Sequence, residues 1–281
     1  SGDESLPVRA KRTAQPGLLM ARELDLTLRQ DASGDPHPEH LVASGDVQAS
    51  DQQQTIWADD LDVRFDRSDT SELVVGKLVA SGDVELKLEN GARAWGDRLV
   101  GSGVRRNVEI SSSDGDVVLL RGNVIADSLR VIRFDDDEKV ANSEGPGRFR
   151  FYEVPLLVAD QGRASPPDLE AIKPSLEATW GRSMRFKDNE NEGASALELE
   201  GDVIVRNRPD VLEENDLDAG FLRLDFAMRA STPIIDSEGL PLDANTREAF
   251  SNSRDLIALI AREGARMESR AWNDETHVGD P

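Results

Sequence analysis

The heptapeptide LVASGDV occurs twice in this chain, at residues 41–47 and 78–84. Each copy is followed by a tryptophan and then by Asp-x-Leu, with the tryptophans at Trp57 and Trp95. A sequence copied in this way encodes one supersecondary unit built more than once, and a unit this small cannot bury its own apolar face. We therefore expect the copies to stack on one another or to fold against a second sheet.

Shorter parts of the same unit recur further along the chain. Gly-(Asp or Asn)-Val starts at Gly45, Gly82, Gly122 and Gly201, and (Ala or Gly)-Asp-x-Leu occupies 58–61, 96–99 and 126–129. The recurrence predicts that one strand and one bend are built repeatedly, which gives an elongated body with two sheets.

Apolar and polar residues alternate through most of the chain. Leu61, Val63 and Phe65 alternate with Asp62 and Arg64, and the same pattern occupies 24–28, 84–88, 149–151, 197–199, 203–205 and 222–228. A period of two indicates strands with one dry face, and half-buried strands of this kind belong to antiparallel sheets. The fold class is therefore all-β and antiparallel, with the alternating acids and arginines expected to face water.

Three local signals refine this prediction. Asn90-Gly91 and Asp114-Gly115 each lie between alternating segments and supply the positive-φ residues that tight hairpins need. The stretch RDLIALIAR at 254–262 has spacing compatible with a helix. It also resembles the second copy of the repeat, so we expect a strand there.

Prolines mark the expected domain organisation. Residues 155–174 contain four prolines and little alternation, and such long connections are uncommon inside a compact domain. We therefore expect an N-terminal tail at 1–17, a β module at 18–154, a proline-rich connection at 155–174 and a second β module at 175–281. The last stretch, ESRAWNDETHVGDP, looks like an incomplete repeat or a frayed terminus.

Composition excludes several classes of function. The net charge of -22 argues against nucleic acid as a partner, because phosphate binding needs clustered Lys and Arg. The absence of cysteine excludes disulfides and thiolate metal sites. No run of apolar residues is long enough to span a membrane, and the start lacks the apolar region of a signal peptide. The chain is thus cytosolic, or it is an envelope protein without its leader or anchor.

Catalytic signals are weak. His37 and His40 have spacing compatible with a metal pair, but no third ligand is evident. We expect the DPHPEH segment to be a solvated loop. No nucleophile elbow, phosphate-binding loop or dinucleotide fingerprint is found. We expect no enzyme activity, no catalytic residue, no cofactor and no metal.

Carboxylates that recur in each unit favour structural roles, because an active site needs one constellation and not several. One repeated position holds Asp46, Asp83 and Asp202, and another holds Asp59, Asp97 and Asp127. Acidic clusters at 135–138 and 213–218 could hold Ca²⁺, but they lack the glycine that a calcium loop needs at its bend, so solvated turns are the simpler interpretation.

Two longer segments carry a resemblance to a known family. LVASGDV followed by WADDLDVRFD, and VVLLRGNVIADSLRVIRFDDDEKVANSEGPGRFRF, resemble the OstA-like (LptA-type) family of lipopolysaccharide-transport periplasmic proteins. The family's Gly-x-Val strand, Ala-Asp-x-Leu strand and late Gly-Pro-Gly are matched by 45–47, 58–61 and 145–147. The match is best over 18–151 and fainter over 180–275.

The resemblance implies a repeat-built β-jellyroll whose two sheets form a V-shaped groove, with modules stacked end to end into a bridge across the periplasm. It also implies lipopolysaccharide or another lipid as ligand. Because this chain is longer and more acidic than a simple bridge protein, it would be a divergent, larger member.

A groove of this kind has a physical reason. Each acyl CH₂ in water costs about 0.8 kcal/mol, so a long chain crosses an aqueous space only under apolar cover. The inward candidates for such a groove are Trp57, Val63, Phe65, Leu86, Leu88, Trp95, Leu129, Val131, Phe149 and Phe151. The same residues could equally be ordinary sheet core with no ligand.

Arginines and sheet edges give the remaining expectations. Arginines at 105–106, 121, 130, 133, 148 and 150 could meet lipid phosphates, or could balance nearby acids across strands. Open sheet edges could pair with a second copy or with another jellyroll module.

Three functions remain open from the sequence. The first is a cell-envelope protein that binds lipid acyl chains between two sheets in the periplasm. The second is a structural or adhesive β-repeat protein with a filled core. The third is a polysaccharide-active β-sandwich enzyme, which would need two unrepeated carboxylates in a cleft.

Overall fold

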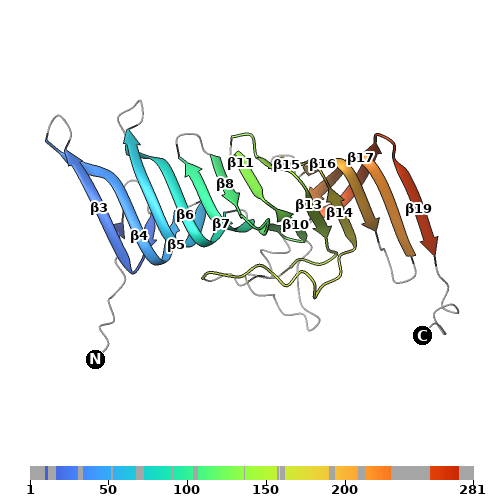
Figure 1. Cartoon of the computed structure of the whole chain (residues 1–281), viewed down its shortest axis with the longest axis horizontal. Helices are drawn as coiled ribbons and strands as arrows, with labels where there is room; N and C mark the ends of the chain where they lie inside the picture. The colour runs from blue at the N-terminus through green and yellow to red at the C-terminus, as the bar shows by residue number, and fades with distance from the viewer. Residues whose placement is uncertain are drawn as a thin grey trace. The chain divides into compact units, whose positions relative to one another are not determined.

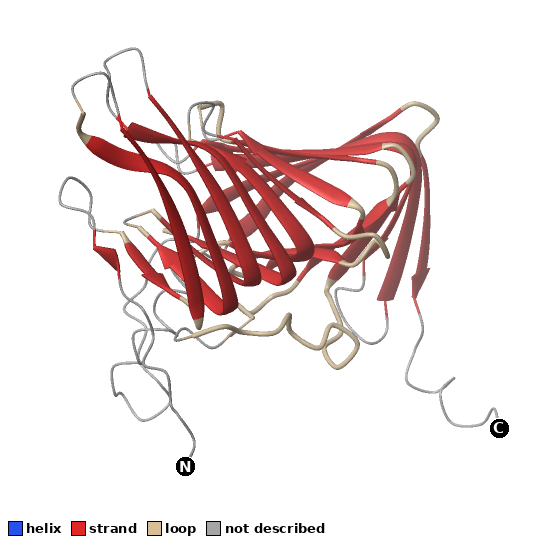
Figure 2. Cartoon of the chain, turned by 60° about the vertical axis from the view of Figure 1, so that its left-hand side comes forward, coloured by secondary structure: helices blue, strands red, loops and turns tan. Residues whose placement is uncertain are grey.

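The computed structural model describes residues 10–11, 17–30, 34–51, 53–67, 73–89, 91–103, 107–135, 137–156, 158, 162–189, 194–207, 213–228 and 254–271. In these ranges every regular element is a β-strand, as Figure 2 shows. All the strand pairs whose register is defined are antiparallel. The all-β, antiparallel prediction is confirmed.

The chain divides into two compact units, one formed by residues 1–117 and 131–138 and the other by residues 118–130 and 139–281. Unit 1 contains β1 (Ala10–Lys11), β2 (Leu18–Met20), β3 (Glu23–Gln30), β4 (Pro36–Ser50), β5 (Gln54–Arg67), β6 (Leu73–Leu88), β7 (Arg93–Ser102), β8 (Asn107–Ser111) and β11 (Val131–Asp135). Unit 2 contains β10 (Val124–Leu129), β12 (Val140–Glu144), β13 (Gly147–Phe151), β14 (Leu176–Trp180), β15 (Ser183–Asn189), β16 (Ala194–Asn207), β17 (Glu213–Met228), β18 (Arg254–Arg262) and β19 (Arg266–Ala271). β9 (Val117–Arg121) belongs to unit 2 from Val118 onward.

Unit 1 is an antiparallel meander. Strands β3, β4, β5, β6, β7, β8 and β11 pair successively, each with the next in that order. Figure 1 shows β3 to β7 side by side. The second half of β4 pairs with β2, which in turn pairs with β1. β4 therefore contributes to two successive stretches of sheet.

The repeated heptapeptide encodes a bend. Both residues of each Gly-Asp pair have a positive φ. The angles are 76° and 51° at Gly45-Asp46, 78° and 42° at Gly82-Asp83, and 83° and 47° at Gly201-Asp202. Each pair lies where the register with the neighbouring strand shifts, which is the geometry of a β-bulge. At Gly82 an added Cβ would lie 2.4 Å from Asp59 Oδ2, so only glycine fits there.

The core of unit 1 is a row of side chains that oppose one another across seven strands. The row consists of Leu24, Ala43, Leu61, Ala80, Leu99, Ile110 and Ile132. All of these except Leu24 are buried. Small residues alternate with large ones over part of this row, which lets neighbouring strands pack without voids.

In unit 2, as at β4, the two halves of one long strand pair with two different strands. One half of β16 pairs with β15 and the other with β14, while β17 runs along its opposite edge. β17 then pairs with β18 through one half and with β19 through the other. The Gly201-Asp202 bulge of β16 lies between its two halves.

Aromatic residues fill the core of unit 2. The Phe226 ring lies 6.0 Å from Phe149 and 6.1 Å from Phe151, centroid to centroid. Gly147 lies beneath Trp180 and Leu129, where an added Cβ would come within 2.4 Å and 2.5 Å of their side chains. The late Gly-Pro-Gly of the sequence therefore permits this close approach.

Several local predictions can now be compared with the structure. Residues 254–262 form the strand β18, as expected. Asp114-Gly115 does not close a hairpin, because β8 already has β7 and β11 as its two neighbours. Gly122 lies in a turn between β9 and β10 and not in a bulge. Asn90 of the other expected hairpin lies outside the described residues, although β6 and β7 pair on either side of it.

The expectation that the alternating charges face water is wrong at several positions. Glu85, Asp127 and Arg150 are 0%, 3% and 2% exposed. Glu85 is buried because both faces of its strand are covered there, as the burial of Val84 and Leu86 on either side of it shows. It forms a buried ion pair with Arg93, which offsets the cost of removing the charge from water.

Residues 155–174 contain no strand in their described part and lie within unit 2. Of the expected tail at 1–17, the structure describes β1 and Gly17. No helix in the described ranges is long and apolar enough to cross a membrane.

Candidate functional site

The apolar face of unit 1 is the face of its meander that carries the core row, and a second apolar row runs beside that row. This second row consists of Leu26, Leu41, Val63, Leu78, Gly101, Val108 and Phe134, each opposite the next on neighbouring strands. Leu41 and Val63 are buried at 8% and 6% exposure, but Leu26 is 42% exposed. The row is thus buried at β4 and β5 and most exposed at β3.

Exposure also rises along β3 itself. Leu24, Leu26 and Leu28 share one face of this strand, and they pass from half-buried to 42% and 56% exposed. β3 pairs along one edge with β4, and none of the described residues pairs with its other edge. Among the described residues β3 is therefore an edge strand, and the apolar face is most exposed at Leu26 and Leu28.

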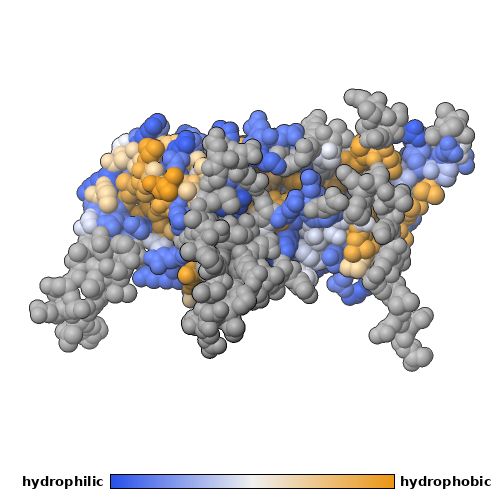
Figure 3. Space-filling model, turned by 180° about the vertical axis from the view of Figure 1, so that it is seen from behind, coloured by the Kyte–Doolittle hydropathy of each residue, from blue (hydrophilic) through white to orange (hydrophobic). Residues whose placement is uncertain are grey.

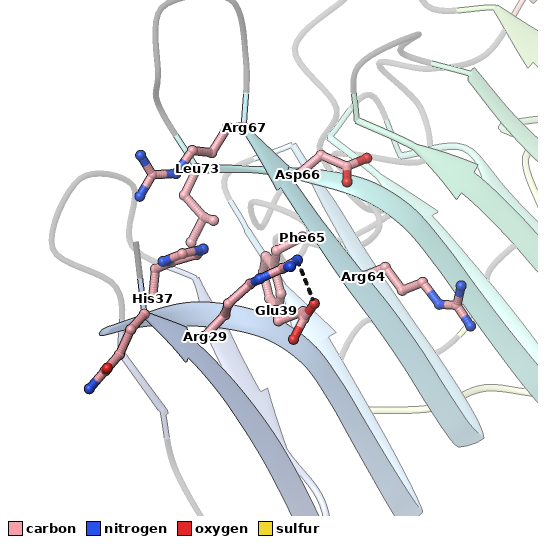
Figure 4. Close-up of a pocket in the computed structure, with 9 residues that line it drawn as sticks. Arg29, His37, Glu39, Arg64, Phe65, Asp66, Arg67 and Leu73 are labelled. Carbon is pink, nitrogen blue, oxygen red and sulfur yellow. Dashed lines mark hydrogen bonds and ion pairs between the residues drawn. The ribbon is translucent and has the colours of Figure 1, made fainter. Parts of the chain in front are cut away.

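A cavity of about 530 Å³ opens at the same end of unit 1, where β3, β4, β5 and β6 begin or finish (Figure 4). We call it the end cavity. Its lining consists of Arg29, Gln30, His37, Glu39, Arg64, Phe65, Asp66, Arg67 and Leu73. The lining is amphipathic, since Phe65 continues the alternation of Leu61 and Val63 along β5 while most of the other side chains are charged.

One ion pair of the end cavity is exposed to solvent. Arg29 Nη1 donates to Glu39 Oε1 at 3.0 Å, and both side chains are largely exposed at 68% and 45%. His37 is half-buried, and its Nδ1 is sealed from solvent without a hydrogen-bond partner. Figure 4 shows Arg29, Glu39 and Phe65 close together, with His37 and Arg67 beside them and Arg64 directed away.

Unit 2 also exposes apolar residues at an open edge. Strands β18 and β19 each pair with β17 alone among the described residues. Ile257, Leu259, Ile260 and Met267 on these strands are 62%, 42%, 37% and 66% exposed. Figure 3 shows apolar side chains gathered over β17 and β18 on the face in view. Among the described residues, no further strand pairs with this edge, and it carries apolar surface.

The structure places the ten predicted groove residues in two classes. Six are buried, with exposures of 7% or less: Trp57, Val63, Leu86, Trp95, Leu129 and Phe149. Four are half-buried: Phe65, Leu88, Val131 and Phe151. The buried six are already in contact with protein atoms, so only the half-buried four offer surface to a ligand without rearrangement.

The faces on which these residues lie also differ. Val63 and Phe65 lie on the apolar face of unit 1, but Val131 lies on the opposite face of β11 from Ile132. Trp57 and Trp95 both oppose the buried Glu85 in register. The two tryptophans therefore flank a buried carboxylate.

Sequence reasoning did not select Leu26, Leu28, Arg29, His37 and Arg67 as lipid-binding residues. The alternation in ELDLTLRQ marks Leu26 and Leu28 as one face of a strand, which is the available signal. The sequence does not say that β3 would be an edge strand. The end cavity has no sequence signal, because its lining comes from four separate strands.

The acids that recur in the repeat have structural partners. Asp46 pairs with Arg22, Asp97 accepts hydrogen bonds from Ser112 Oγ at 2.8 Å and the Ser113 amide at 3.1 Å, and Asp127 pairs with Arg148 at 2.7 Å. In the described residues no group of three or more His, Asp or Glu is placed to hold a metal ion. His40 Nε2 lies 3.0 Å from Asp62 Oδ1, which gives it a single carboxylate neighbour.

The arginines also have acidic neighbours. Arg133 pairs with Glu109 at 2.8 Å, and Arg121 pairs with Asp188. Arg150 lies 3.5 Å from Asp127 and 3.1 Å from Glu170. Burial raises the pKa of the Tyr152 phenol, and the positive charge of Arg150 opposes that rise. These contacts favour charge balance within the fold over lipid recognition at these positions.

A comparison with solved structures finds a partial likeness to a lipopolysaccharide-transport protein. That structure is LptH from Pseudomonas aeruginosa, described as the LptA homologous periplasmic component of the lipopolysaccharide transport device. The sequence identity is 12%, the match covers 46% of this chain and 82% of that chain, and the TM-score is 0.37. No protein-family model and no curated protein matches this chain.

Proposed function

We propose that this protein binds the acyl chains of a lipid along the apolar face of unit 1, in the cell envelope. The observation that carries the proposal is the uncovered end of this face, where Leu26 and Leu28 are 42% and 56% exposed in continuity with a buried row. A contiguous apolar surface that reaches solvent is typical of a binding site.

The energetics favour an acyl ligand. An apolar chain lying on Leu26, Leu28 and Phe65 would leave water without the cost of forming a new cavity. Each buried CH₂ would contribute about 0.8 kcal/mol, so a chain of about ten carbons could gain several kcal/mol after the cost of association.

The periplasm as the location, and lipopolysaccharide as the lipid, rest on the resemblance of the sequence to the OstA-like family. Under this proposal the chain works as a passive carrier or bridge. The open edge of unit 2 would then accept a strand from a second copy or from another jellyroll module, because no described strand other than β17 pairs with β18 or β19.

A structural β-repeat protein with a filled core is the second candidate. The observation that favours it is the burial of six of the ten predicted groove residues to 7% exposure or less. The two candidates differ at the uncovered end of unit 1, which only a lipid-binding protein would use.

Site-specific photo-crosslinking tests the proposal. A photo-reactive amino acid is placed at Leu28 or Phe65 on the apolar face, and the purified protein is exposed to lipopolysaccharide and irradiated. Asp25 and Thr27 are the matched controls, because they are exposed and lie on the opposite face of β3. Mass spectrometry should find lipid adducts at Leu28 and Phe65.

The same experiment separates the two candidates. Equal labelling at all four positions, or no labelling at saturating lipid, would remove the acyl-binding proposal and leave the filled-core protein.

A further inference from the structure

We propose that Asn123 is a clasp that holds strand β18 on unit 2, and that breaking the clasp releases β18 and β19 together from β17. The release is a local opening, in which the rest of unit 2 stays folded. It uncovers the edge of β17 with which β18 and β19 pair. The clasp lies within unit 2 and does not depend on the lipid proposed for unit 1.

Asn123 joins three segments that are far apart in the sequence. It is fully buried, at 0% exposure, in the turn between β9 and β10. Its Nδ2 donates to the Tyr152 carbonyl at 2.8 Å and to the Arg254 carbonyl at 3.0 Å. Its Oδ1 accepts a hydrogen bond from the Arg254 amide at 2.9 Å, and its own carbonyl accepts one from the Tyr152 amide at 3.0 Å. The residue after β13 and the first residue of β18 are therefore both tied to Asn123.

The contacts of the clasp require an amide side chain. Asn123 occupies the repeat position that holds Asp46, Asp83 and Asp202 elsewhere, and those three aspartates are exposed. An amide both donates and accepts, so it pairs with the amide and the carbonyl of Arg254 as a neighbouring strand would. A carboxylate could not donate to either carbonyl. Asn in place of Asp therefore gives this copy of the repeat a buried contact that the other copies lack.

A buried ion-pair network holds the same residue of β18 through its side chain. The Arg254 side chain is 1% exposed, and its Nη2 lies 3.7 Å from Asp188 Oδ1. Asp188, near the end of β15, also pairs with Arg121, the last residue of β9. Removing one partner of a buried ion pair is strongly destabilising. The start of β18 is therefore fixed both by its backbone and by its first side chain.

The rest of β18 has little buried surface to hold it. Arg254 is the one buried residue of this strand, and Ile257, Leu259 and Ile260 are 62%, 42% and 37% exposed. Among the described residues, β18 and β19 pair with β17 alone. Segments with few buried apolar contacts open locally at a lower free energy than the core. The attachment of β18 is therefore concentrated at the clasp.

Hydrogen exchange followed by mass spectrometry at increasing urea concentration tests the clasp. The variant is Asn123→Asp, which keeps the acceptor and removes both donated hydrogen bonds. The matched control is Asp202→Asn, the converse exchange at the same repeat position of unit 2, where the side chain is exposed. Circular dichroism verifies that each variant is folded.

In the wild-type protein, the amides of β18 and β19 should exchange through an opening that needs less urea than the exchange of β14 and β16. In Asn123→Asp we expect β18 and β19 to exchange about tenfold or more faster, because two hydrogen bonds of their closed state are lost. The exchange of β14 and β16 should change by less than about threefold, since these strands stay folded during the opening. Asp202→Asn should exchange as wild type does.

Several results would overturn the clasp. Equal acceleration in β14, β16 and β18 would make Asn123 an ordinary core residue of unit 2. Unchanged exchange of β18, or faster exchange confined to β10 and β13, would show that Asn123 does not hold β18. If Asn123→Asp does not fold, the wild-type measurement decides: a separate opening of β18 and β19 supports the clasp, and exchange of β18 together with β16 at every urea concentration overturns it.

Discussion

Leu26 lies directly opposite Leu41 across the β3–β4 pair, and only Leu41 is buried, at 8% exposure against 42%. The two leucines belong to the same row of side chains on the apolar face of unit 1. Leu41 is covered because β5 continues the sheet on its far side, with Val63 opposite it. No described strand continues the sheet on the far side of Leu26. This difference is the basis of the proposed lipid site.

The bend at Gly82 should depend on glycine. Gly82 has φ at 78°, and an added Cβ would meet Asp59 Oδ2 at 2.4 Å. We expect Gly82→Ala to lower the free energy of unfolding by about 1–3 kcal/mol, through backbone strain and this clash. Urea denaturation measures the change.

Gly101→Ala is the control for that substitution. Gly101 also lies in unit 1, but its φ is not positive, and the atom nearest to an added Cβ is 3.8 Å away. Its free energy of unfolding should change by less than about 1 kcal/mol. Similar losses in both variants would contradict the assignment of the repeated Gly-Asp as a bulge that requires glycine.

Asp127 should be essential to unit 2. Its side chain is 4% exposed and lies 3.5 Å from that of Arg150, which is 3% exposed. We expect Asp127→Ala to destabilise the protein by about 3–5 kcal/mol, because Arg150 would remain buried without its main counter-charge. Glu170→Gln removes a second partner, which is 84% exposed, leaves Asp127 and Glu177 in place, and should cost less than about 1 kcal/mol. If chemical denaturation showed the same loss of unfolding free energy for both variants, burial would not determine how much each ion pair contributes to stability.

Tyr152 should make stability fall at alkaline pH. Burial raises its pKa above the ordinary value of 10.0, against the opposing effect of Arg150. Above the unfolded pKa the unfolded phenol loses its proton while the folded phenol keeps it. Stability therefore falls as the pH rises from about 10 towards the folded pKa, by at most about 1.4 kcal/mol per pH unit.

Tyr152 is the single tyrosine of the chain, so the absorbance of tyrosinate reports on it directly. The phenol should ionise in the folded protein only above the pH at which a free tyrosine does. Tyr152→Phe should flatten the alkaline loss of stability in urea titrations. Ionisation of the folded phenol near pH 10 would contradict its burial.

The bends and the strand pattern could be predicted from the sequence because each has a local cause. A Gly-Asp pair permits the positive φ of a bulge, and the alternation of Leu61, Val63 and Phe65 fixes one apolar face. The expected hairpin at Asp114-Gly115 failed for a non-local reason. The strand β8 has its two edges occupied by β7 and β11, and turn residues alone do not reveal that.

The exposure of each strand could not be predicted. Leu24, Leu26 and Leu28 have the same alternation as Leu61, Val63 and Phe65, yet β3 lies at an edge and β5 in the middle of the meander. Glu85 has the sequence pattern of an outward residue and is buried between Trp57 and Trp95. In both cases the exposure of the side chain depends on which strands lie beside it, and tertiary packing determines that arrangement.

The most direct measurement is the affinity of the purified, delipidated protein for a diacyl lipid, compared between two double variants of one strand pair. L26Q/L28Q alters the uncovered apolar face at β3. T27Q/V42Q alters exposed residues on the opposite face of β3 and β4. Both should melt near the wild-type temperature, because substitutions at exposed positions usually change stability by less than about 0.5 kcal/mol.

The account predicts that L26Q/L28Q binds the lipid about tenfold or more weakly than wild type, since two apolar contacts with the chains are lost. T27Q/V42Q should bind as wild type does. Unchanged affinity in L26Q/L28Q, or an equal loss in both variants, would contradict an acyl-binding face at the open end of unit 1.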